Sequence, residues 1–431
     1  MAFWEPEIEQ MGRGDLEALQ LKRLQETVGR AAKAPHYQRI FQQTGISPDS
    51  IRSLEDIRRL PLTSKDDLRA EQPSDFLALP QADVVRLHAS SGTTGKPTAV
   101  LHSQADLDAW TNLVARSLCM VGMTRDDVFQ NMIGYGLFTG GLGLHYGAEK
   151  LGATVIPAGV GNSRRQINLM QQFHTTALHI IPSYALKLLE TLHGLGMDPA
   201  RDLDLRMAVI GAEPHSEETR LRLQEAYDIK AFNCYGLSEM NGPAVGFECT
   251  YQTGLHIWED NFYLEILNPE TLEPMPEGQT GEIVLTTLCR QAMPLIRYRT
   301  KDLARIEPEP CPCGRVHRRL SRIQGRSDDM LILKGVNIFP VQIEHVLMAH
   351  QHTGGNYVIV LDKEGPLDTM TVRVEMSRQL TDASPDQVRA VERDLSRLLK
   401  DEILISPKVE LVEPNGLASG EGKAVRVLDN R

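Results

Sequence analysis

Between residues 150 and 237 the chain alternates short apolar runs with longer amphipathic segments. The apolar runs end in Gly, Pro or polar residues and occupy 152–159, 177–183, 206–213 and 229–236. The segments between them, such as 163–173 and 216–227, repeat their apolar positions at helical spacing. Alternation of strand, helix and strand implies right-handed crossovers and a mostly parallel sheet. This part of the chain therefore predicts an α/β architecture.

Polar and small residues follow two of these predicted strands. Gly211, Ala212 and Glu213 end one apolar run, and Tyr235 and Gly236 end another. Ligands of open parallel sheets bind beyond the carboxyl ends of the strands. We therefore expect both sets of residues at a ligand site.

The remaining pattern divides the chain into two domains. Residues 60–70 predict a turn and then a helix with Thr63 or Ser64 as its N-cap. Apolar runs from 255 to 306 indicate twisted β structure. We predict an α/β protein whose large N-terminal domain, residues 1–327, has mostly parallel sheets plus β structure. A hinge joins it to a small, mobile α+β C-terminal domain, residues 328–431.

Composition and charge narrow the class of partner. Of the 431 residues 41% are hydrophobic and 24% charged, and the net charge of −11 disfavours nucleic acid or an anionic membrane as the main partner. Glu5, Glu7 and Glu9 are unlike a secretory signal peptide, and no apolar run approaches the roughly 18 residues that span a bilayer. Six cysteines in such a chain favour a reducing compartment, so the cytoplasm is the predicted location.

Residues 90–98, SSGTTGKPT, place hydroxyl groups, backbone N–H groups and the ammonium of Lys96 in one short loop. The loop fails the spacing of a Walker motif, because only two residues separate its glycines and a proline follows Lys96. The flanking stretches 83–89 and 98–103 predict two strands. The residues alone are consistent with a phosphate clamp and equally with a Ser/Thr-rich hairpin turn.

Several residues further along have the chemistry of a nucleotide site. Glu239 could hold Mg²⁺ between phosphates, Tyr235 could stack on a base, and Asp302 could accept both ribose hydroxyls. Each also has an ordinary interpretation, as a surface glutamate, a core tyrosine and a salt-bridged aspartate. Arg326 and Asp328 lie at the predicted domain junction, where a charged pair suits a hinge and also an ordinary turn.

Two pairs of Cys and His residues suggest a metal site. Cys311 and Cys313 form a tight pair on a Pro/Gly turn, and six residues separate Cys249 from His256. Four soft or borderline ligands in two loops suit a structural tetrahedral Zn²⁺, although the spacing is not that of a standard zinc finger. His317 is the substitute ligand if His256 points elsewhere, and free cysteines are the alternative. We predict that such a zinc ion stabilises the fold rather than catalyses a reaction.

Taken in order, these stretches closely resemble the adenylate-forming superfamily of acyl-CoA synthetases, and most of all its phenylacetate–CoA ligase family. The motifs that carry the resemblance cover nearly the whole chain: SSGTTGKPT (90–98), GYGLFTGGLGLHYGAEKLG (134–152), GAEP (211–214), YGLSE (235–239), HIWED (256–260), IRYRTKDL (296–303), GRSDDMLILKGVNIFP (325–340) and GEGKAVRV (420–427).

The resemblance implies an ATP-dependent acid–thiol ligase that works in two steps. A carboxylate attacks the α-phosphate of ATP to give an acyl-adenylate and pyrophosphate, and the thiol of CoA then displaces AMP to form a thioester. Because the transition state concentrates negative charge on the phosphates, fixed cations and N–H donors are the expected catalyst.

The resemblance also assigns roles to individual positions. The residues expected at the β- and γ-phosphates are Ser90, Ser91, Gly92, Thr93, Thr94 and Lys96. Those expected around the adenine are Gly211, Ala212, Glu213, Tyr235 and Gly236. The remaining assignments are Ser238 to the α-phosphate, Glu239 to Mg²⁺, and Asp302 and Arg326 to the ribose. Lys423 would bridge the carboxylate and the α-phosphate, and its Gly-rich loop suits a residue that swings in and leaves.

For thioester formation, the C-terminal domain would rotate about Asp328 and bring Lys334 and Gly335 to the site, where CoA binds. The residues expected along the acyl group are Gly134, Tyr135, Phe138, Gly141, Ala212 and Pro243. They suggest a flat apolar slot for an aromatic ring. Phenylacetate is the first candidate, in aromatic acid catabolism, with benzoates, indoleacetate and aminobenzoates as competitors.

Two alternatives remain at this point. The chain could pass its acyl group to another acceptor, such as a carrier-protein thiol, or it could be a non-catalytic acyl-nucleotide-binding relative. Retention of Lys423, Glu239 and Asp302 argues against the second, because a sensor needs affinity but not the charges that activate. The resemblance further implies a homodimer.

Overall fold

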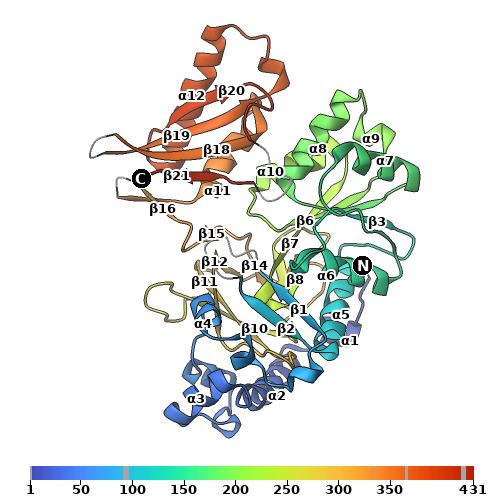
Figure 1. The fold of residues 1–431 in the computed structure, drawn as a ribbon, viewed down its shortest axis with the longest axis vertical. Coiled ribbons are helices and arrows are strands. Elements are labelled where there is room, and N and C mark those ends of the chain that lie inside the picture. The colour runs from blue at the N-terminus through green and yellow to red at the C-terminus, as the bar shows by residue number, and fades with distance from the viewer. Residues whose placement is uncertain (1, 91–96, 334, 365–366, 419–423) are drawn as a thin grey trace. The chain divides into compact units, whose positions relative to one another are not determined.

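The computed structural model describes residues 2–90, 97–333, 335–364, 367–418 and 424–431 (Figure 1). The chain divides into two compact units. Unit 1 comprises residues 1–159 and 232–323, and unit 2 comprises residues 160–231 and 324–431. Parallel strand pairs, antiparallel pairs and helices occur together, and a smaller α+β region ends the chain. The predicted α/β fold class, with a smaller C-terminal α+β part, is confirmed.

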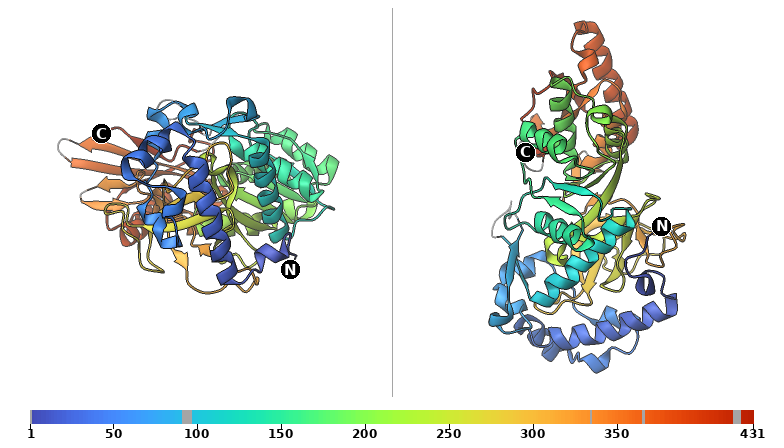
Figure 2. Two further views of the ribbon diagram at one scale, coloured as in Figure 1. Left: turned by 90° about the horizontal axis from the view of Figure 1, so that it is seen from below. Right: turned by 90° about the vertical axis from the view of Figure 1, so that its right-hand side faces the viewer.

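Unit 1 begins with helices, and the right-hand view of Figure 2 shows α2 lengthwise in blue. Its helices are α1 (Pro6–Glu9), α2 (Arg13–Ala31), α3 (Pro35–Thr44), α4 (Lys65–Ala70), α5 (Gln104–Met120) and α6 (Thr139–Leu151). The 3₁₀ turns are η1 (Pro48–Ser50), η2 (Leu54–Arg59), η3 (Pro73–Phe76), η4 (Gln81–Asp83) and η5 (Ser238–Met240).

The strands of unit 1 form several ladders. An antiparallel pair joins β1 (Arg86–Ala89) and β2 (Ala99–His102), which confirms the two strands predicted on either side of the Ser/Thr-rich segment. A parallel pair joins β3 (Val128–Asn131) and β4 (Thr154–Ile156). The antiparallel ladder β10-β11-β12 consists of Phe262–Leu267, Gly281–Thr287 and Tyr298–Ala304. A second antiparallel series, β13-β14-β9-β8-β7, consists of Ile306–Glu307, Arg319–Leu320, Leu255–Ile257, Gly242–Glu248 and most of Lys230–Leu237.

Side-chain caps fix where the helices of unit 1 begin. The Ser64 hydroxyl accepts from the Asp67 backbone N–H at 3.3 Å, and Asp67 accepts from the Ser64 backbone N–H at 2.7 Å. Of the two predicted caps of α4, the structure therefore uses Ser64. The same reciprocal arrangement of Ser103 and Asp106 begins α5. Such capping boxes satisfy backbone donors that a helix leaves unpaired at its start.

Glycines allow helices α5 and α6 to pack closely. A Cβ atom on Gly143 would lie 2.3 Å from the indole of Trp110, and one on Gly147 would lie 2.2 Å from Val114. Both distances are far below van der Waals contact, so these positions of α6 exclude larger residues. The glycines of residues 140–147 therefore allow α6 to pack on α5, and Gly141 also packs against the segment that precedes α6.

Unit 2 contains a parallel pair with its helices and a C-terminal α+β region. The first part consists of α7 (Ser163–Phe173), β5 (Ala177–Ile180), α8 (Pro182–Gly194), α9 (Pro199–Asp202), β6 (Met207–Gly211) and α10 (Glu217–Tyr227). The C-terminal part begins with β15 (Gly325–Arg326) and the hairpin of β16 (Leu331–Leu333) and β17 (Val336–Ile338). It continues with α11 (Pro340–Ala349), β18 (Thr353–Glu364), β19 (Leu367–Met376), η6 (Arg378–Leu380), α12 (Pro385–Ile403), β20 (Lys408–Val412) and β21 (Val427–Asp429).

The C-terminal sheet has the order β20-β19-β18-β21, with α11 and α12 packed against it (Figure 1). Within unit 2, Glu344 of α11 accepts hydrogen bonds from Ser216 N at 3.0 Å and from the Tyr357 hydroxyl at 2.9 Å. Arg222 of α10 donates to carbonyl oxygens of Met348 and neighbouring residues. These contacts tie α10 to the C-terminal region. Among the described residues, no helix is both long and apolar enough to cross a membrane.

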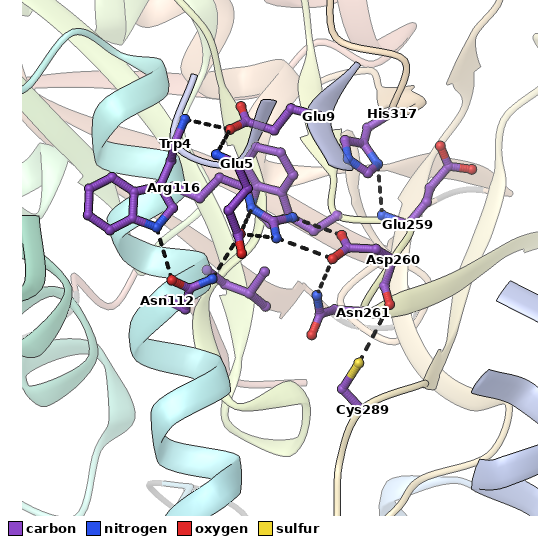
Figure 3. Close-up of polar contacts among 12 residues, drawn as sticks. Trp4, Glu5, Glu9, Asn112, Arg116, Glu259, Asp260, Asn261, Cys289 and His317 are labelled. Atoms are coloured by element: carbon purple, nitrogen blue, oxygen red, sulfur yellow. Dashed lines mark hydrogen bonds and ion pairs between the residues drawn. The ribbon is translucent and has the colours of Figure 1, made fainter. Parts of the chain in front are cut away.

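A buried ionic network in unit 1 centres on Arg116 of α5 (Figure 3). Its guanidinium donates two hydrogen bonds to Asp260, at 2.8 and 3.2 Å, and one to Glu5 at 2.8 Å from Nε. Arg116 and Asp260 are each 2% exposed. Burial acts to raise the pKa of Asp260, but the positive charge of Arg116 more than offsets it, so the pKa is lowered. Glu5 thereby ties the N-terminal segment to α5.

We predict that Arg116→Met lowers the free energy of unfolding of unit 1 by about 3 kcal/mol at neutral pH, because it removes the cation that is hydrogen-bonded to the buried Asp260 and leaves only Arg23, at 3.6 Å. In the wild type the ionised Asp260 stabilises the fold above its unfolded pKa, and this stabilisation is lost as the pH falls through the lowered folded pKa. In the variant, burial favours the protonated acid and Arg23 offsets this only in part, so the difference between the two proteins should shrink from pH 7 to pH 4. Urea unfolding followed by tryptophan fluorescence measures this difference in the free energy of unfolding, since Trp4, Trp110 and Trp258 all lie in unit 1.

Arg59→Met is the matched control, because Arg59 pairs with Asp56 at 3.5 Å on the exposed surface of unit 1. Exposed pairs contribute little to stability. Equal losses in the two variants, or a loss in Arg116→Met that does not change with pH, would contradict the interpretation.

Candidate active site

The turn between β7 and β8 presents Ser238 and Glu239. Tyr235 ends the regular part of β7, and the register shifts before Gly236 pairs with Pro243. Gly242 has φ +106°, and a Cβ atom there would lie 2.6 Å from Thr139, so only glycine fits. The tight turn brings the Ser238 hydroxyl to 3.3 Å from the hydroxyl of Thr139, the first residue of α6.

Glu239 is a buried carboxylate with two cations beside it. Glu239 is 4% exposed, and its Oε1 lies 3.3 Å from Nζ of Lys65. Arg290, which is 2% exposed, donates from Nη1 to the backbone oxygen of Glu239. Burial lowers the pKa of Arg290 to about 10, so this guanidinium is charged at neutral pH. The surface-glutamate interpretation of Glu239 is therefore wrong.

The loop that carries Arg290 is held by the same residue that caps α5. Asp106 accepts hydrogen bonds from the backbone N–H groups of Gln291 at 2.6 Å and Ala292 at 3.0 Å. Asp106 is 1% exposed, and its negative charge favours the charged form of Arg290. A single buried carboxylate thus begins a helix and fixes the position of the arginine at Glu239.

Tyr235 and Asp302 meet directly. The Tyr235 hydroxyl donates to Asp302 Oδ2 at 2.7 Å, and both residues are 9% exposed. Asp302 lies on β12, so the hydrogen bond joins the β7–β8 hairpin to the β10-β11-β12 ladder. Unit 1 therefore brings together Tyr235, Ser238, Glu239 and Asp302 from the predicted set. Asp302 thus contacts another residue of that set.

The ends of the Ser/Thr-rich loop are closed by hydrogen bonds. Ser90 N donates to Thr98 O at 3.0 Å, and Thr98 N donates to the Ser90 hydroxyl at 3.2 Å. The Ala89 backbone N–H donates to Leu137 O at 2.9 Å, so β1 is tied to the predicted acyl segment. Seven of the predicted site residues lie outside the described residues: Ser91, Gly92, Thr93, Thr94, Lys96, Lys334 and Lys423.

The segment before α6 is organised by Asn131 and Tyr135. Asn131 Nδ2 donates to the Tyr135 hydroxyl at 2.8 Å and to Gly141 O at 2.7 Å. The Tyr135 hydroxyl also lies 3.2 Å from His145 Nδ1. Burial raises the pKa of Tyr135 to about 12, so it stays neutral and keeps its proton for hydrogen bonding. Of the predicted acyl residues, the structure gathers Gly134, Tyr135 and Gly141, since a Cβ atom on Gly141 would lie 2.4 Å from Gly134 O.

Two other predicted acyl residues lie at the borders of this segment. Phe138 is the N-cap residue of α6. The carbonyl of Pro243 accepts a hydrogen bond from the Trp110 indole at 3.0 Å, and the proline ring also limits the space at Gly143.

The predicted residues of unit 2 form two local sets. Ala212, with φ +67°, follows Gly211 at the end of β6, and the next residue, Glu213, accepts from Ser183 N at 2.7 Å. Burial raises the pKa of Glu213, and the hydrogen bonds from Ser183 only partly offset this. The N–H of Ala424, next to position 423, lies 3.5 Å from Glu213 Oε2.

The second set lies at the predicted hinge. Arg326 donates from Nε to Asp328 Oδ1 at 2.9 Å and from Nη2 to Oδ2 at 2.9 Å. Gly335 is exposed, has φ +78° and has no neighbouring atom near a Cβ position. The pairing of Arg326 with Asp328 therefore exists, on the surface of unit 2.

The four predicted metal ligands are brought together and buried in unit 1. Donor atoms of Cys249, His256, Cys311 and Cys313 all lie within 4.8 Å of one another. His256 Nδ1 lies 3.2 Å from His317 O, to which it can donate, leaving Nε2 3.4 Å from the Cys313 sulfur. His317 instead faces Glu259 N at 3.2 Å, so it is not the ligand of this cluster (Figure 3).

Thiols and imidazole in this cluster share protons. Burial acts to lower the pKa of His256, but Cys311 and Cys313 more than offset it and raise that pKa. Hydrogen bonds from Cys249 and His256 lower the pKa of the Cys313 thiol. A partly deprotonated set of three sulfurs and one imidazole has the ligand chemistry that Zn²⁺ prefers.

A cavity in the described part of unit 1 lies elsewhere. It has a volume of about 210 Å³ and is lined by η2 and by β10 and the turn that follows it, including Arg58, Tyr263 and Met275. None of the predicted site residues lines it. The candidate site is therefore defined by its polar groups rather than by cavity size.

Sequence reasoning missed Lys65, Asp106, Arg290 and Thr139. The stretch LTSKDD at 62–67 predicted only a capped helix. A usable signal was present there, because a lysine at the first position of a helix opposes the helix dipole. For Arg290 and Asp106 no local signal exists, since their roles arise from contacts between distant segments.

Comparison with known proteins places the chain in a family. The family model "AMP-binding enzyme" matches residues 26–289, and "AMP-binding enzyme C-terminal domain" matches residues 335–431. The phenylacetate-coenzyme A ligase of Aromatoleum evansii is 44% identical over 98% of this chain and 96% of its own length. That of Escherichia coli (strain K12) is 44% identical over 98% of this chain and 97% of its own length.

A solved structure is similar over nearly the whole chain. It is the 2-hydroxyisobutyryl-CoA ligase in the postadenylation state in complex with 2-HIB-AMP, with a TM-score of 0.93 and 31% identity. The match covers 99% of this chain and 92% of that one. Both sequence and structure therefore agree with the resemblance in the motifs, and the chain belongs to the phenylacetate–coenzyme A ligase family of AMP-binding, adenylate-forming enzymes.

Proposed function

We propose that the chain is an ATP-dependent aryl-acid–CoA ligase, which forms an acyl-adenylate and then an acyl-CoA thioester and releases pyrophosphate and AMP. The observation that carries the proposal is one short turn that presents Ser238 and the buried Glu239 beside the Tyr235–Asp302 hydrogen bond. Relatives that are 44% identical over almost the whole chain are named phenylacetate-coenzyme A ligases. Their names indicate an aryl acid as the carboxylate substrate and CoA as the thiol.

The Tyr235 hydroxyl donates to Asp302 Oδ2, which fixes the orientation of this carboxylate. Asp302 would also accept hydrogen bonds from the ribose hydroxyls. Arg326 would contact the same ribose after releasing Asp328. Gly211, Ala212, Glu213 and Gly236 would frame the adenine, and Ser90 would begin the loop at the β- and γ-phosphates.

In the adenylation step the carboxylate of the aryl acid attacks the α-phosphate. Ser238, 3.3 Å from Thr139, would donate its hydroxyl proton as a hydrogen bond to an α-phosphate oxygen. Lys423 would neutralise the carboxylate and the α-phosphate as they approach. Preorganised donors of this kind lower the barrier because charge develops where they already point.

Glu239 suits a magnesium ion because its Oε1 is buried and has no hydrogen-bond partner among the described residues. When bound, Mg²⁺ would neutralise negative charge on the phosphates. Arg290 holds the backbone of Glu239 and keeps its carboxylate in place for this.

The acyl group would lie against Gly134, Tyr135, Phe138, Gly141, Ala212 and Pro243. Because the Tyr135 hydroxyl is engaged by Asn131 and His145, it presents the apolar face of its ring rather than a free donor. This favours an aromatic acid without polar ring substituents, with phenylacetate first.

We propose that the boundary between the two domains lies between residues 327 and 328. In the thioester step the C-terminal domain would rotate about Asp328. The rotation would withdraw Lys423 and bring Lys334 and Gly335 to the site of CoA. The hydrogen bonds between Arg326 and Asp328 would open during it, and they lie on the surface where solvent can replace them. A homodimer and a cytoplasmic location are further proposals that rest on the family.

We also propose that Cys249, His256, Cys311 and Cys313 hold a structural Zn²⁺. The loop that bears Cys311 and Cys313 is pinned to the N-terminal segment, because Arg315 and Glu9 form a fully buried ion pair at 2.6 Å. Val316 N also donates to Glu9 O at 3.1 Å. A zinc ion, when bound, would cross-link this loop to the one that bears Cys249 and His256.

Pyrophosphate release tests the proposed function. The chain is incubated with MgATP and a panel of aryl acids, with and without CoA, and pyrophosphate is measured. We expect release that requires the acid, that is fastest with phenylacetate, and that becomes continuous only when CoA removes the bound adenylate. Release that CoA does not accelerate would favour another acceptor, and nucleotide binding without acid-dependent release would favour a non-catalytic relative.

The control is Lys423→Ala. It should abolish acid-dependent pyrophosphate release yet still form phenylacetyl-CoA from supplied phenylacetyl-adenylate, because only the first step uses this lysine. Equal loss of both steps would refute the role of Lys423.

Metal analysis tests the zinc proposal. After dialysis the purified chain should retain about one zinc ion per chain, as expected for a closed four-ligand site. Cys311→Ser should lose the metal and lower the melting temperature. The matched control is Cys119→Ala, at a buried cysteine outside the cluster, which should keep the metal. Zinc-free protein with an unchanged melting temperature would leave these residues as free cysteines.

A further inference from the structure

Lys65 is the first residue of α4 and lies against Glu239. Its Nζ is 3.3 Å from Glu239 Oε1, and its side chain is 36% exposed, compared with 5% for Glu239. A cation in the first turn of a helix faces the positive end of the helix dipole and is unfavourable there. Asp66 and Asp67, in the same turn, are the charges that suit it. Stabilisation of α4 therefore does not explain a lysine at this position, and its role lies in contacts with residues outside this helix.

The backbone before Lys65 is fixed independently of Glu239. Thr63 N donates to Arg297 O at 3.1 Å, and Arg299 N donates to Thr63 O at 2.8 Å. The buried Tyr37 hydroxyl lies 2.9 Å from the Thr63 hydroxyl. These bonds join the start of α4 to the chain at the beginning of β12. The ammonium of Lys65 is therefore presented from a rigid support, as preorganised electrostatic groups are.

The contact of Lys65 with Glu239 is an ion pair without a hydrogen bond. Glu239 Oε1 is buried and has no hydrogen-bond partner within the described part of the chain, although Nζ lies 3.3 Å away. The ammonium can thus turn to another anion without breaking a hydrogen bond. Its partial exposure gives it the freedom to do so.

The charges around Glu239 indicate what that anion is. Glu239 and Asp106 together offset Lys65 and Arg290. A divalent cation on Glu239 adds two positive charges, which a buried site tolerates only with an anion of similar charge. The polyphosphate end of ATP, and the pyrophosphate formed from it, carry that charge.

We propose that Lys65 binds the pyrophosphate leaving group of the adenylation step. This role rests on the proposed function and adds a further catalytic residue to it. A bond forms between a carboxylate oxygen and the α-phosphorus, and the bond from that phosphorus to the bridging oxygen breaks. Its electron pair leaves with pyrophosphate, no proton is transferred, and total charge is conserved. Lys65 turns from Glu239 to the oxygens on which this charge collects.

A structural lysine is the competing explanation. In that case Lys65 would only keep Glu239 in place, and its loss would affect stability and both half-reactions. The two explanations differ in pyrophosphate affinity and in the thioester step, which takes place after pyrophosphate has left.

The test compares Lys65→Met and Lys65→Arg with the wild type. Binding of magnesium pyrophosphate is measured by calorimetry, and the two half-reactions are measured as ATP–pyrophosphate exchange with phenylacetate and as thioester formation from supplied phenylacetyl-adenylate. In Lys65→Met we expect pyrophosphate binding to weaken and exchange to fall about 100-fold, the usual effect of removing one transition-state donor. The melting temperature should fall, because the buried Glu239 loses one of its two cations. Thioester formation should nevertheless stay close to that of the wild type, and Lys65→Arg should recover part of the losses.

Lys301→Met is the matched control. Lys301 has 33% side-chain exposure and lies 3.9 Å from the buried carboxylate of Glu282, so it loses the same charge in a similar setting of unit 1. It should bind magnesium pyrophosphate as the wild type does.

Unchanged pyrophosphate binding in Lys65→Met would overturn the proposal, as would equal loss of both half-reactions. Absence of pyrophosphate binding in the wild type would overturn it as well. A wild type that binds pyrophosphate through Lys65 but catalyses no exchange would contradict the proposed function while leaving the site itself supported.

Discussion

The burial of Glu239 beside two cations is the constraint on which the rest of the site depends. A carboxylate that is 4% exposed is costly unless charges and hydrogen bonds compensate it. Unit 1 compensates it from separate directions: Lys65 arrives on α4, Arg290 on the loop after β11, and the tight β7–β8 turn fixes the backbone. The arrangement is balanced without ligand and acquires an excess of positive charge when a divalent cation enters. We propose that this excess favours the binding of polyphosphates.

Two buried ion pairs of unit 1, Arg116–Asp260 and Arg315–Glu9, join distant segments of the fold. Arg116 and Asp260 join α5 to the segment after β9, and the N-terminal segment reaches both this pair through Glu5 and the cysteine loop through Glu9 (Figure 3). The Cys/His cluster lies within the same part of the fold. The N-terminal residues, α5 and the cysteine loop therefore stabilise one another, and α5 in turn supports Arg290 through Asp106.

Local signals in the sequence were sufficient for the elements and for several site residues. Alternating apolar runs predicted the parallel strands and helices, the capping pattern predicted α4, and the spacing of cysteines and histidine predicted a cluster that the structure brings together. Motifs pointed to Tyr235 and Asp302, although only the fold shows that they touch. Arg290 could not be predicted, because its role depends on tertiary contacts with distant residues, whereas the position of Lys65 at the start of α4 was a signal that sequence reasoning missed. The assignments of Lys96 and Lys423 fall outside the described residues and stay predictions.

The most direct measurement is a crystal structure of the wild-type chain with magnesium and a non-hydrolysable ATP analogue. The account predicts a metal ion bound by the Glu239 carboxylate, the ribose on Asp302, and terminal phosphate oxygens within hydrogen-bonding distance of Lys65 Nζ. A triphosphate bound away from Glu239, with the Lys65–Glu239 ion pair still intact, would contradict it.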